Sequence, residues 1–391
     1  MLYILIFSVF VFLSYLVLEN IILNRRLKSI PLRICVTGTR GKSSIVRMLA
    51  SILREEGKNV IAKTTGSKAS FILPDGEEID VPRRGLTSII EQKGLIKKAV
   101  NLNADCFVVE IMSIHPENHF IEAHRLLKPN IVVITNVRCD HIDTMGKTEE
   151  EIASIFALDI TKESTVFIPE KENREIFVSA VKNAGGTLIC VKKDSPDDID
   201  PQIKARGFPG NIELVNALCN HLNIDKKNII SGLEKVKYDI GEFKVWKYRA
   251  RETQKTYFLA NGFAANDPES TFEIISKVNK IFPFARGKLV GLLSLRADRG
   301  DRTIQWIEAL KNGGIDRFKY IYVTGTHAKI VKRKLEKIII LKDKQPEKIM
   351  ETVSNKTNDD DSSVIFGFGN LKGIGSLLID YWNKIGEEYG L

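Results

Sequence analysis

The chain has 391 residues, of which 43% are hydrophobic and 27% are charged. That balance supports large buried cores, most simply in two domains, and excludes a disordered, collagen-like or disulfide-framework protein. The 58 Lys and Arg residues outnumber the 49 Asp and Glu residues and give a formal charge of +9, which favours acidic partners such as nucleotides, polyanions or anionic lipid without choosing among them.

The cysteines indicate a reducing environment for most of the chain. They are widely spaced, mostly within apolar runs, and form neither a C-x-x-C pair nor a zinc-like spacing. Residues of this kind are typical of the reduced core of a cytosolic domain. The five positions are Cys35, Cys106, Cys139, Cys190 and Cys219.

The first predicted element is an apolar helix that crosses a membrane. Leu2–Leu18 contains no charged residue, and continuation through Leu23 gives a helix of about 33 Å, enough for a bilayer core of about 30 Å. The bases Arg25, Arg26 and Lys28 follow the apolar run, which argues against a cleaved signal peptide and places the rest of the chain in the cytoplasm. We therefore expect residues 1–30 to anchor a single-pass protein of the cell membrane; the alternative is a buried core helix.

Residues 31–245 are predicted to form a central α/β domain. A β-rich run at Arg33–Thr37 leads through a glycine-containing turn into an amphipathic helix at Ser43–Glu56. Apolar strands then alternate with helical stretches, as in a parallel sheet of the P-loop type. The further strands are expected at Cys106–Val109, Asn130–Ile134, Thr165–Ile168 and Thr187–Val191, and the helices at Leu86–Asn101 and Thr148–Thr161.

Residues 246–391 are predicted to form a second, Rossmann-like α/β domain. It follows a polar and aromatic segment at Lys235–Thr256, so the boundary is expected near residue 245. The acidic run Asp359–Asp361 is predicted to be a solvated loop. The strands are expected at Tyr257–Ala260, Lys288–Leu293, Tyr320–Val323, Ile338–Leu341 and Ser363–Phe366, and the helices at Pro268–Phe282, Thr303–Asn312, Ala328–Lys337 and Pro346–Ser354, with one more at the end.

A phosphate-binding loop is the strongest local signal. It lies between the first strand and its helix, where glycines let backbone N–H groups approach phosphate and the helix start adds a favourable dipole. Lys42 is expected to neutralise phosphate charge and Ser43 to offer its hydroxyl to Mg²⁺. Val36 replaces the first glycine of the full Walker pattern, so the match is to a shorter form; an ordinary glycine-rich turn is the alternative. The loop residues are Gly38, Thr39, Arg40, Gly41, Lys42, Ser43 and Ser44.

This shorter loop resembles the ATP loop of the Mur ligase superfamily, whose members form amide bonds by phosphorylating a carboxylate and letting an amine displace the phosphate. Further segments match the superfamily in the same order. They are Glu110–Ser113 after a strand, Asn136–Asp143 with its D-H-x-D, Gly210–Asn211 with Asn216–Ala217, Phe263–Pro268 with Ala265 in place of a histidine, and Arg296–Arg302.

Within the superfamily, the chain most resembles the membrane-anchored ligase family of poly-γ-glutamate synthases. The resemblance runs from the apolar N-terminus through Lys63–Gly66 and Asn261–Asp267 to Gly367–Asn370. In addition, Gly38 stands only about ten residues beyond the predicted span, which leaves no room for the nucleotide-sugar domain that precedes the ATP loop in peptidoglycan Mur ligases. A polymeric or small amino-acid substrate is therefore favoured.

The resemblance implies ATP and Mg²⁺ as cofactors and assigns roles to residues. Ser43, Glu110 and His141 are expected to hold the metal, because a hydroxyl, a carboxylate and an imidazole can converge at the carboxyl edge of one sheet. Lys42, Glu110, His141 and Arg299 are the predicted catalytic residues. The nucleotide contacts expected outside the loop are Asn211, Asn266, Arg296, Asp298 and Arg302, those of the second domain acting when it closes.

The chain departs from many superfamily members in one respect. They bind a second metal through a carbamylated lysine a dozen or so residues beyond the D-H-x-D segment, whereas this chain has Ala153–Phe156 there and its nearest lysine is Lys162. The sequence therefore leaves open whether a second metal is bound. Lys63, Arg83 and Arg84 are weaker hypotheses for contacts with glutamate carboxylates.

The favoured function is an ATP-dependent amide ligase that polymerises glutamate into γ-linked polyglutamate through an acyl phosphate at the inner membrane face. The resemblance also implies small membrane subunits as partners, and nucleic acid is not expected. Two alternatives stay open: a folylpolyglutamate-type or cell-wall amino-acid ligase, and a non-catalytic nucleotide-binding membrane scaffold.

Overall fold

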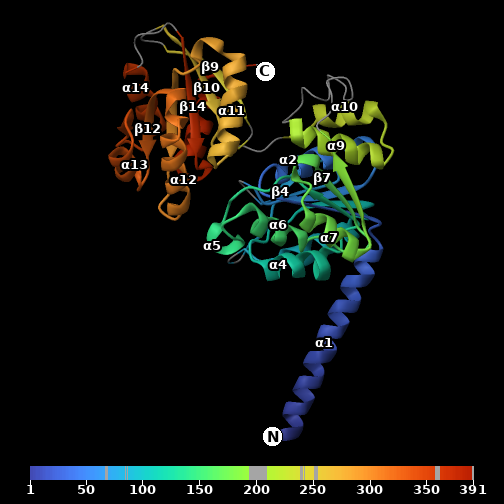
Figure 1. The fold of residues 1–391 in the computed structure, drawn as a ribbon. Helices are drawn as coiled ribbons and strands as arrows, with labels where there is room; N and C mark the ends of the chain where they lie inside the picture. Colours follow the sequence, from blue (N-terminus) through green and yellow to red (C-terminus); the bar gives the residue numbers. More distant parts are fainter. Residues whose placement is uncertain are drawn as a thin grey trace. The chain divides into compact units, whose positions relative to one another are not determined.

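The chain folds into two compact units in a computed structural model. It describes residues 1–66, 69–83, 85, 87–192, 209–237, 241, 243–250, 254–356 and 362–389. The first unit is Met1–Lys237 and the second is Tyr238–Leu391. The units therefore divide eight residues before the position expected from the sequence, and each is described by itself below (Figure 1).

The first unit is built on a sheet with the strand order β4-β3-β2-β5-β1-β6-β7-β8. Strands β2, β5, β1, β6, β7 and β8 run parallel, and β3 and β4 add an antiparallel edge. The strands are β1 (Leu32–Thr37), β2 (Val60–Thr64), β3 (Ser70–Ile72), β4 (Glu78–Asp80), β5 (Cys106–Glu110), β6 (Ile131–Ile134), β7 (Thr165–Pro169) and β8 (Thr187–Val191).

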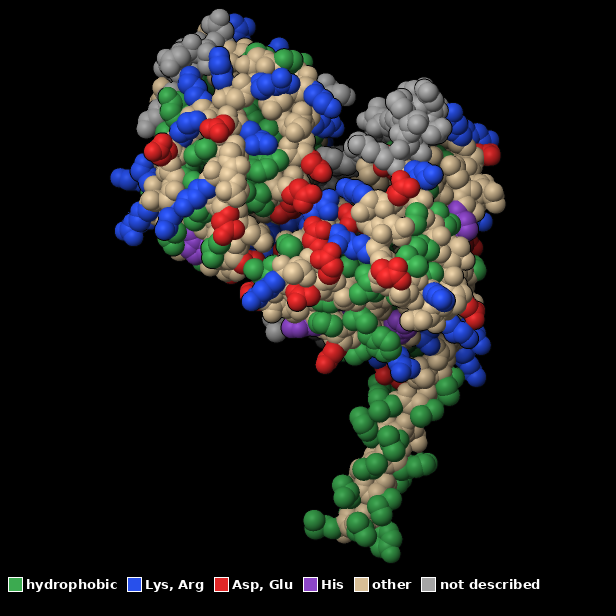
Figure 2. Space-filling view, viewed as in Figure 1, with side chains coloured by type: hydrophobic (Ala, Val, Ile, Leu, Met, Phe, Trp, Pro, Cys, Tyr) green, Lys and Arg blue, Asp and Glu red, His purple; other side chains and the backbone are tan. Residues whose placement is uncertain are grey.

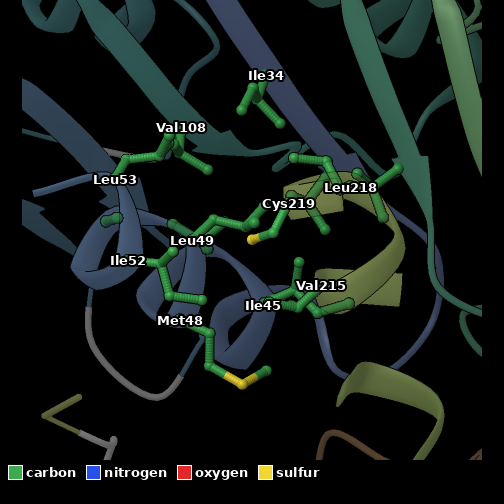
Figure 3. Close-up of a cluster of buried hydrophobic side chains, with 14 of the residues drawn as sticks. Ile34, Ile45, Met48, Leu49, Ile52, Leu53, Val108, Val215, Leu218 and Cys219 are labelled. Carbon is green, nitrogen blue, oxygen red and sulfur yellow. The ribbon is translucent and has the colours of Figure 1, made fainter. Parts of the chain in front are cut away.

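Helices cover both faces of this sheet. Alternate residues of β1 point to opposite sides: Ile34 and Val36 join a core with α2, α9 and α10, whereas Cys35 joins a core with α1, α3 and η1 (Figure 3). Helices α6 and α7 also pack on the second side, against β6 and β7. The helical segments are α1 (Leu2–Lys28), α2 (Lys42–Glu55), α3 (Glu91–Asn101), α4 (Pro116–Phe120), η1 (Ile121–Leu127), α5 (Ile142–Met145), α6 (Glu149–Ala157), η2 (Glu170–Glu172), α7 (Glu175–Ala184), α9 (Pro209–His221) and α10 (Lys226–Glu234).

The second unit repeats the three-layer plan around a sheet of order β13-β12-β11-β14-β10-β9-β15. Strands β13 to β10 are parallel, whereas β9 and β15 are antiparallel. The strands are β9 (Val245–Arg249), β10 (Thr256–Asn261), β11 (Leu289–Ser294), β12 (Phe318–Thr324), β13 (Ile338–Ile340), β14 (Ser362–Gly369) and β15 (Glu387–Glu388). The helical segments are α11 (Pro268–Ile281), η3 (Pro283–Ala285), α12 (Gly300–Lys311), η4 (Gly314–Arg317), α13 (Ala328–Lys334), α14 (Pro346–Lys356), η5 (Leu371–Gly375) and α15 (Ser376–Ile385).

Helix α1 extends away from the first unit (Figure 1). An 18-residue window of it has a mean hydropathy of 2.3 and no buried residue, so by length and composition it is able to cross a membrane. Its apolar side chains are exposed along the protruding part, as Figure 2 shows. The predicted mixed α/β fold with parallel sheets and an apolar N-terminal helix is confirmed.

Four predicted helix boundaries are wrong by three residues or more. Helix α12 begins at Gly300 rather than at Thr303. Helix α6 ends at Ala157 rather than Thr161, because the chain turns there and places Asp159 3.0 Å from the His119 ring. Helix α13 ends at Lys334 rather than at Lys337, which has a left-handed φ of 57°. Helix α3 begins at Glu91 rather than at Leu86, and Leu86 itself lies outside the described residues, as does the acidic run at 359–361.

Candidate active site

The candidate site of the first unit lies at the carboxyl edge of its sheet. Strand β1 is flanked by β5 and β6, and all three run parallel, so the segments that follow them emerge side by side. Backbone hydrogen bonds fix these segments to one another: Thr135 N donates to Thr37 O at 2.9 Å, and Thr39 N donates to Asn136 O at 3.0 Å. The loop after β1, the glutamate that ends β5 and the D-H-x-D segment after β6 therefore meet, as the order of the motifs predicts.

Two glycines shape the loop because a side chain would not fit at either position. Gly38 has a φ of 118°, and a Cβ built on it would stand 2.3 Å from Thr135 Oγ1. Gly41 has a φ of 86°, and its Cβ would stand 2.5 Å from Asn211 Oδ1. Both residues thus combine a left-handed backbone with close packing, which only glycine tolerates. Asn211, at the start of α9, packs directly on the loop.

Polar side chains hold the loop in this shape. The Asn136 side chain accepts a hydrogen bond from Arg40 N at 3.0 Å and donates one to Arg40 O at 3.1 Å. Thr39 Oγ1 accepts from Arg138 N at 3.0 Å. Helix α2 begins at Lys42, so Ser43 and Ser44 lie in its first turn, where backbone N–H groups lack partners within the helix. Unpartnered N–H groups at the start of a helix are able to bind the phosphates of a nucleotide. Because no side chain fits at Gly38 or Gly41, the backbone itself forms the surface of the loop.

Lys42 folds back over the loop. Its Nζ donates to the carbonyl oxygens of Gly38, at 2.5 Å, and Thr39, at 3.3 Å. Removal of the ammonium group from water lowers the pKa of Lys42, while the nearby carboxylate of Glu110 raises it. The Lys42 side chain is thus held within the loop by two of the loop's own carbonyl oxygens, and its role toward a phosphate stays a prediction.

Ser43 and Glu110 form a direct pair. The Ser43 hydroxyl donates to Glu110 Oε2 at 2.6 Å, and Thr65 N donates to the same oxygen at 2.8 Å. Glu110 is 4% exposed and ends β5, the strand next to β1. A hydroxyl and a carboxylate this close supply two of the oxygen ligands that hard divalent cations prefer. The donor set therefore fits a divalent cation beside the loop.

His141 lies in the same region, but its metal role stays a prediction. Arg40 Nη2 pairs with Asp140 Oδ2 at 3.3 Å, which joins the loop to the D-H-x-D segment. Asp140 Oδ1 accepts from His141 N at 2.9 Å, and His141 has a left-handed φ of 49°. A strained backbone at a non-glycine residue is often retained where the side chain has to point in one direction.

The predicted residues of the second unit also gather at one sheet edge. The loops after β10 and β11 carry Asn266 and Arg296, and both strands pair with β14 in parallel. Arg296 binds Asp298 through Nε at 2.9 Å and Nη2 at 2.5 Å, and this contact lowers the pKa of Asp298. Arg299 pairs with Asp301 at 3.4 Å. Arg302 is only 5% exposed, so its side chain belongs to the interior of this unit in the conformation described.

A buried polar network behind Glu110 has no local sequence signal. Glu122 is fully buried, and its carboxylate accepts from Gln92 Nε2 at 2.5 Å, from Met112 N at 3.3 Å and from Ser113 N at 3.1 Å. Burial raises the pKa of Glu122. The network fixes the loop that follows Glu110. Gln92 and Glu122 are 30 residues apart in the sequence, and the packing of α3, η1 and β5 in one core brings them together.

Lys63 is also part of this interior. It is fully buried, and its Nζ lies 3.1 Å from Glu91 Oε2, which also binds Arg83. The Lys63 ammonium group is therefore not exposed to a glutamate carboxylate in this conformation. Arg84 lies outside the described residues. The stretch Ala153–Phe156 lies in α6 with Ala153, Ile155 and Phe156 in the core, and the side chain of Lys162 is 86% exposed.

Comparisons with known proteins identify the family. Residues 36–258 match the Mur ligase middle domain, and residues 245–385 match the poly-gamma-glutamate synthase CapB C-terminal domain. PGA synthase CapB of Bacillus subtilis is 30% identical over 365 residues, which cover 91% of each chain. The chain belongs to the CapB family of Mur ligases. The predicted resemblance is confirmed, and with it the class of ATP-dependent amide ligase.

Other relatives match part of their own length. Capsule biosynthesis protein CapB of Bacillus anthracis is 31% identical over 286 residues, which are 72% of this chain and 61% of that protein. A UDP-N-acetylmuramoylalanine–D-glutamate ligase of Streptococcus agalactiae is 22% identical over 77% of this chain and 61% of its own. The chain thus spans less than two thirds of these two relatives.

Solved structures share the fold. A bifunctional folylpolyglutamate synthase/dihydrofolate synthase of Yersinia pestis, complexed with AMPPNP and a Mn ion, has a TM-score of 0.71 at 14% identity, over 93% of this chain and 92% of its own. E. coli FolC in complex with ADP has a TM-score of 0.67 at 15% identity, over 95% and 97% of the two chains. At this identity the likeness concerns the fold alone.

Proposed function

We propose that this chain uses ATP and Mg²⁺ to polymerise glutamate into γ-linked polyglutamate at the inner face of a membrane. The observation that carries the proposal is the hydrogen bond of 2.6 Å between Ser43 and Glu110 beside an ordered phosphate loop, in a chain that aligns over 91% of its length with a PGA synthase. This pairing, in a member of the CapB family, supports an ATP site built around the loop that follows β1.

The first chemical step joins two anionic reactants. An oxygen of the glutamate side-chain carboxylate attacks the γ-phosphorus of ATP, the bond to the bridging oxygen breaks, and ADP leaves with that electron pair. The loop backbone and Lys42 would bind and orient the triphosphate. Ser43 and Glu110, with His141, would hold the divalent cation, whose charge offsets the repulsion between triphosphate and carboxylate.

The second step forms the amide bond. The α-amino group of the next glutamate attacks the acyl carbon, the carbon–oxygen bond to phosphate breaks, and inorganic phosphate and one proton are released. We assign the positioning of nucleotide and acyl phosphate in the second unit to Asn266, Arg296, Asp298, Arg299 and Arg302. Their common location at one sheet edge supports this assignment.

The membrane location is part of the proposal. Helix α1 has the length and hydropathy of a single span, and its basic residues Arg25, Arg26 and Lys28 all lie in its last turns. These features support an anchor with both α/β units on the cytoplasmic side. Small membrane subunits of a synthase complex belong to the same proposal, and co-purification from membranes of the native organism tests them.

The decisive experiment supplies membranes containing the full chain with ATP, Mg²⁺ and labelled glutamate. We expect a labelled polymer that ordinary peptidases do not cleave, together with ADP in proportion to the glutamate incorporated. The variant Lys42→Ala serves as the control and should form none. ATP turnover without dependence on glutamate would contradict the proposal, and an absence of turnover would favour the non-catalytic scaffold. Incorporation only onto an added folate would favour a folylpolyglutamate-type ligase.

A further inference from the structure

The last turns of α1 are part of the folded first unit rather than a flexible tether. Leu23 and Leu27 are 8% and 4% exposed, and Ile30, just beyond the helix, is fully buried. All three belong to the core that contains Leu95 and Ile96 of α3. Because apolar packing of this kind fixes side chains in place, α1 and α3 move as one body.

Polar contacts reinforce the junction. Glu19 Oε1 pairs with Lys93 Nζ of α3 at 2.7 Å, and Asn24 Oδ1 accepts from Lys128 Nζ, just after η1, at 2.7 Å. The guanidinium of Arg33 donates to carbonyl oxygens at and just after the end of α1, at 3.4 and 2.8 Å. Apolar packing and polar contacts together therefore fix the direction of α1 relative to the first sheet.

These contacts place α3 and η1 at a defined height above a membrane. Glu19 is the first charged residue after the run Leu2–Leu18 and pairs with Lys93 of the folded unit, so we place the boundary of the hydrocarbon core at Glu19 rather than at Leu23, where the sequence alone put it. Lys93 then lies at the same level. Asn24 and its partner Lys128 stand five residues further along α1, a rise of about 7.5 Å. One headgroup layer is about 5–7 Å thick. The start of α3 and the end of η1 therefore bracket that layer.

The surface at this height is basic with an apolar tip. Ile90 is 63% exposed and precedes Lys93 by one turn, and Lys97 follows on the same face of α3 and is exposed. Arg25 of α1 and Arg125 of η1 are exposed as well. Figure 2 shows Lys and Arg side chains around the point where the apolar helix enters the first unit. Glu19 offsets the charge of Lys93, and Glu91 pairs with Lys63 and Arg83, so Lys97, Arg25 and Arg125 give this surface its positive charge.

We propose that this surface is a seat for anionic phospholipid headgroups. It consists of Ile90, Lys93, Lys97 and Arg125 with Arg25 of α1, and we call it the lipid seat. Basic side chains within a Debye length of the bilayer are attracted to anionic lipids, and an exposed Ile at the headgroup boundary gains by partial insertion. The inference rests on the proposed membrane location and adds to it the face that contacts the bilayer and the lipid class.

The native tryptophans make the seat directly testable. Trp246, Trp306 and Trp382 all lie in the second unit and are 2%, 0% and 0% exposed, so quenchers in a bilayer cannot reach them. A tryptophan introduced by Ile90→Trp then reports on lipid contact. The matched control is Lys227→Trp, on α10, at a position whose side chain is 78% exposed on the opposite face of the sheet.

The full chain carrying either substitution is reconstituted into vesicles whose lipids bear bromine near the glycerol end of the acyl chains. We expect the quenching of Ile90→Trp to exceed that of Lys227→Trp several-fold and to increase when phosphatidylglycerol is added to phosphatidylcholine. When Lys97→Glu and Arg125→Glu are combined with Ile90→Trp, we expect the increase in quenching with phosphatidylglycerol to disappear. Equal quenching at the two positions overturns the seat, and quenching that ignores phosphatidylglycerol overturns its preference for anionic lipid. A chain that fails to float with the vesicles refutes the membrane location itself, whereas a floating chain with an unquenched Ile90→Trp refutes the seat alone.

Discussion

Replacement of Gly41 by Ala tests whether the loop binds ATP in the shape described. Gly41 has a φ of 86°, and alanine in that conformation costs about 1–2 kcal/mol. The added Cβ would also stand 2.5 Å from Asn211 Oδ1, so either the loop or Asn211 has to move, and overpacking of this kind costs about 1–3 kcal/mol. We expect a total loss in the free energy of unfolding of about 2–5 kcal/mol.

Gly57 supplies a matched control. Its φ is 80°, almost the same as that of Gly41, but a Cβ there meets nothing within 4 Å. Gly57→Ala should therefore lose only the backbone part, about 1–2 kcal/mol, and keep normal activity. The difference between the two variants isolates the contact with Asn211. Removal of the amide by Asn211→Gly in the Gly41→Ala background should recover much of that difference.

Two assays separate stability from nucleotide binding. Pulse proteolysis in urea gives the free energy of unfolding of the first unit, which contains no tryptophan. Glutamate-dependent ATP hydrolysis gives the KM for ATP. A displaced loop is expected to raise that KM about 5- to 150-fold in Gly41→Ala, the ratio that corresponds to 1–3 kcal/mol, and to leave it unchanged in Gly57→Ala. Equal losses of stability in the two variants, or a normal KM in Gly41→Ala, would refute the reasoning.

Three further substitutions probe the same unit. Ser43→Ala and Glu110→Ala should each raise the Mg²⁺ concentration needed for half-maximal activity, and their effects should be non-additive because the two side chains are 2.6 Å apart; a Mg²⁺ titration of both single variants and the double variant checks this. Burial lowers the pKa of Lys42 below its ordinary 10.5, so the charged form destabilises the folded state at neutral pH. The free energy of unfolding of the wild type, compared with that of Lys42→Met, should therefore increase as the pH rises through the lowered pKa toward 10.5. A difference between the two proteins that does not change with pH would contradict this prediction. Ser51→Ala should cost about 1–3 kcal/mol without changing the KM for ATP, because it leaves the buried carbonyl of Gly232 without the donor that now lies at 2.7 Å, and urea unfolding measures the loss.

Much of the fold follows from short-range patterns. The apolar run at residues 33–37, the glycines after it and the amphipathic stretch after those predicted β1, the loop and α2 to within one residue. Strands β2, β3 and β4 were not predicted. Strands β3 and β4 have only three residues each, and they are ordered by the pairing of β3 with β2 and of β4 with β3. Strand order was also outside the reach of local patterns, since β1 lies between two strands that come much later in the chain.

Some features of the candidate site also follow from short-range sequence patterns, and others do not. Lys42 and Ser43 stand within one motif, so their neighbourhood follows from the sequence. The hydrogen bond from Ser43 to Glu110 joins residues 67 apart and depends on the pairing of β1 with β5. Glu122 gave no signal at all, because an isolated acid in an amphipathic segment is usually solvated, and only tertiary packing turns it into the acceptor for the loop after Glu110.

The hydrogen bonds of Lys42 bear on how the enzyme empties its site after each cycle. A phosphate that recruits this ammonium group draws it away from the carbonyl oxygens of Gly38 and Thr39, so the net gain is smaller than the attraction between the two charges. When ADP leaves, the ammonium group of Lys42 returns to the same carbonyl oxygens, and these hydrogen bonds compensate for the lost ion pair. Under the proposed role of Lys42, this exchange of partners makes the release of ADP less unfavourable.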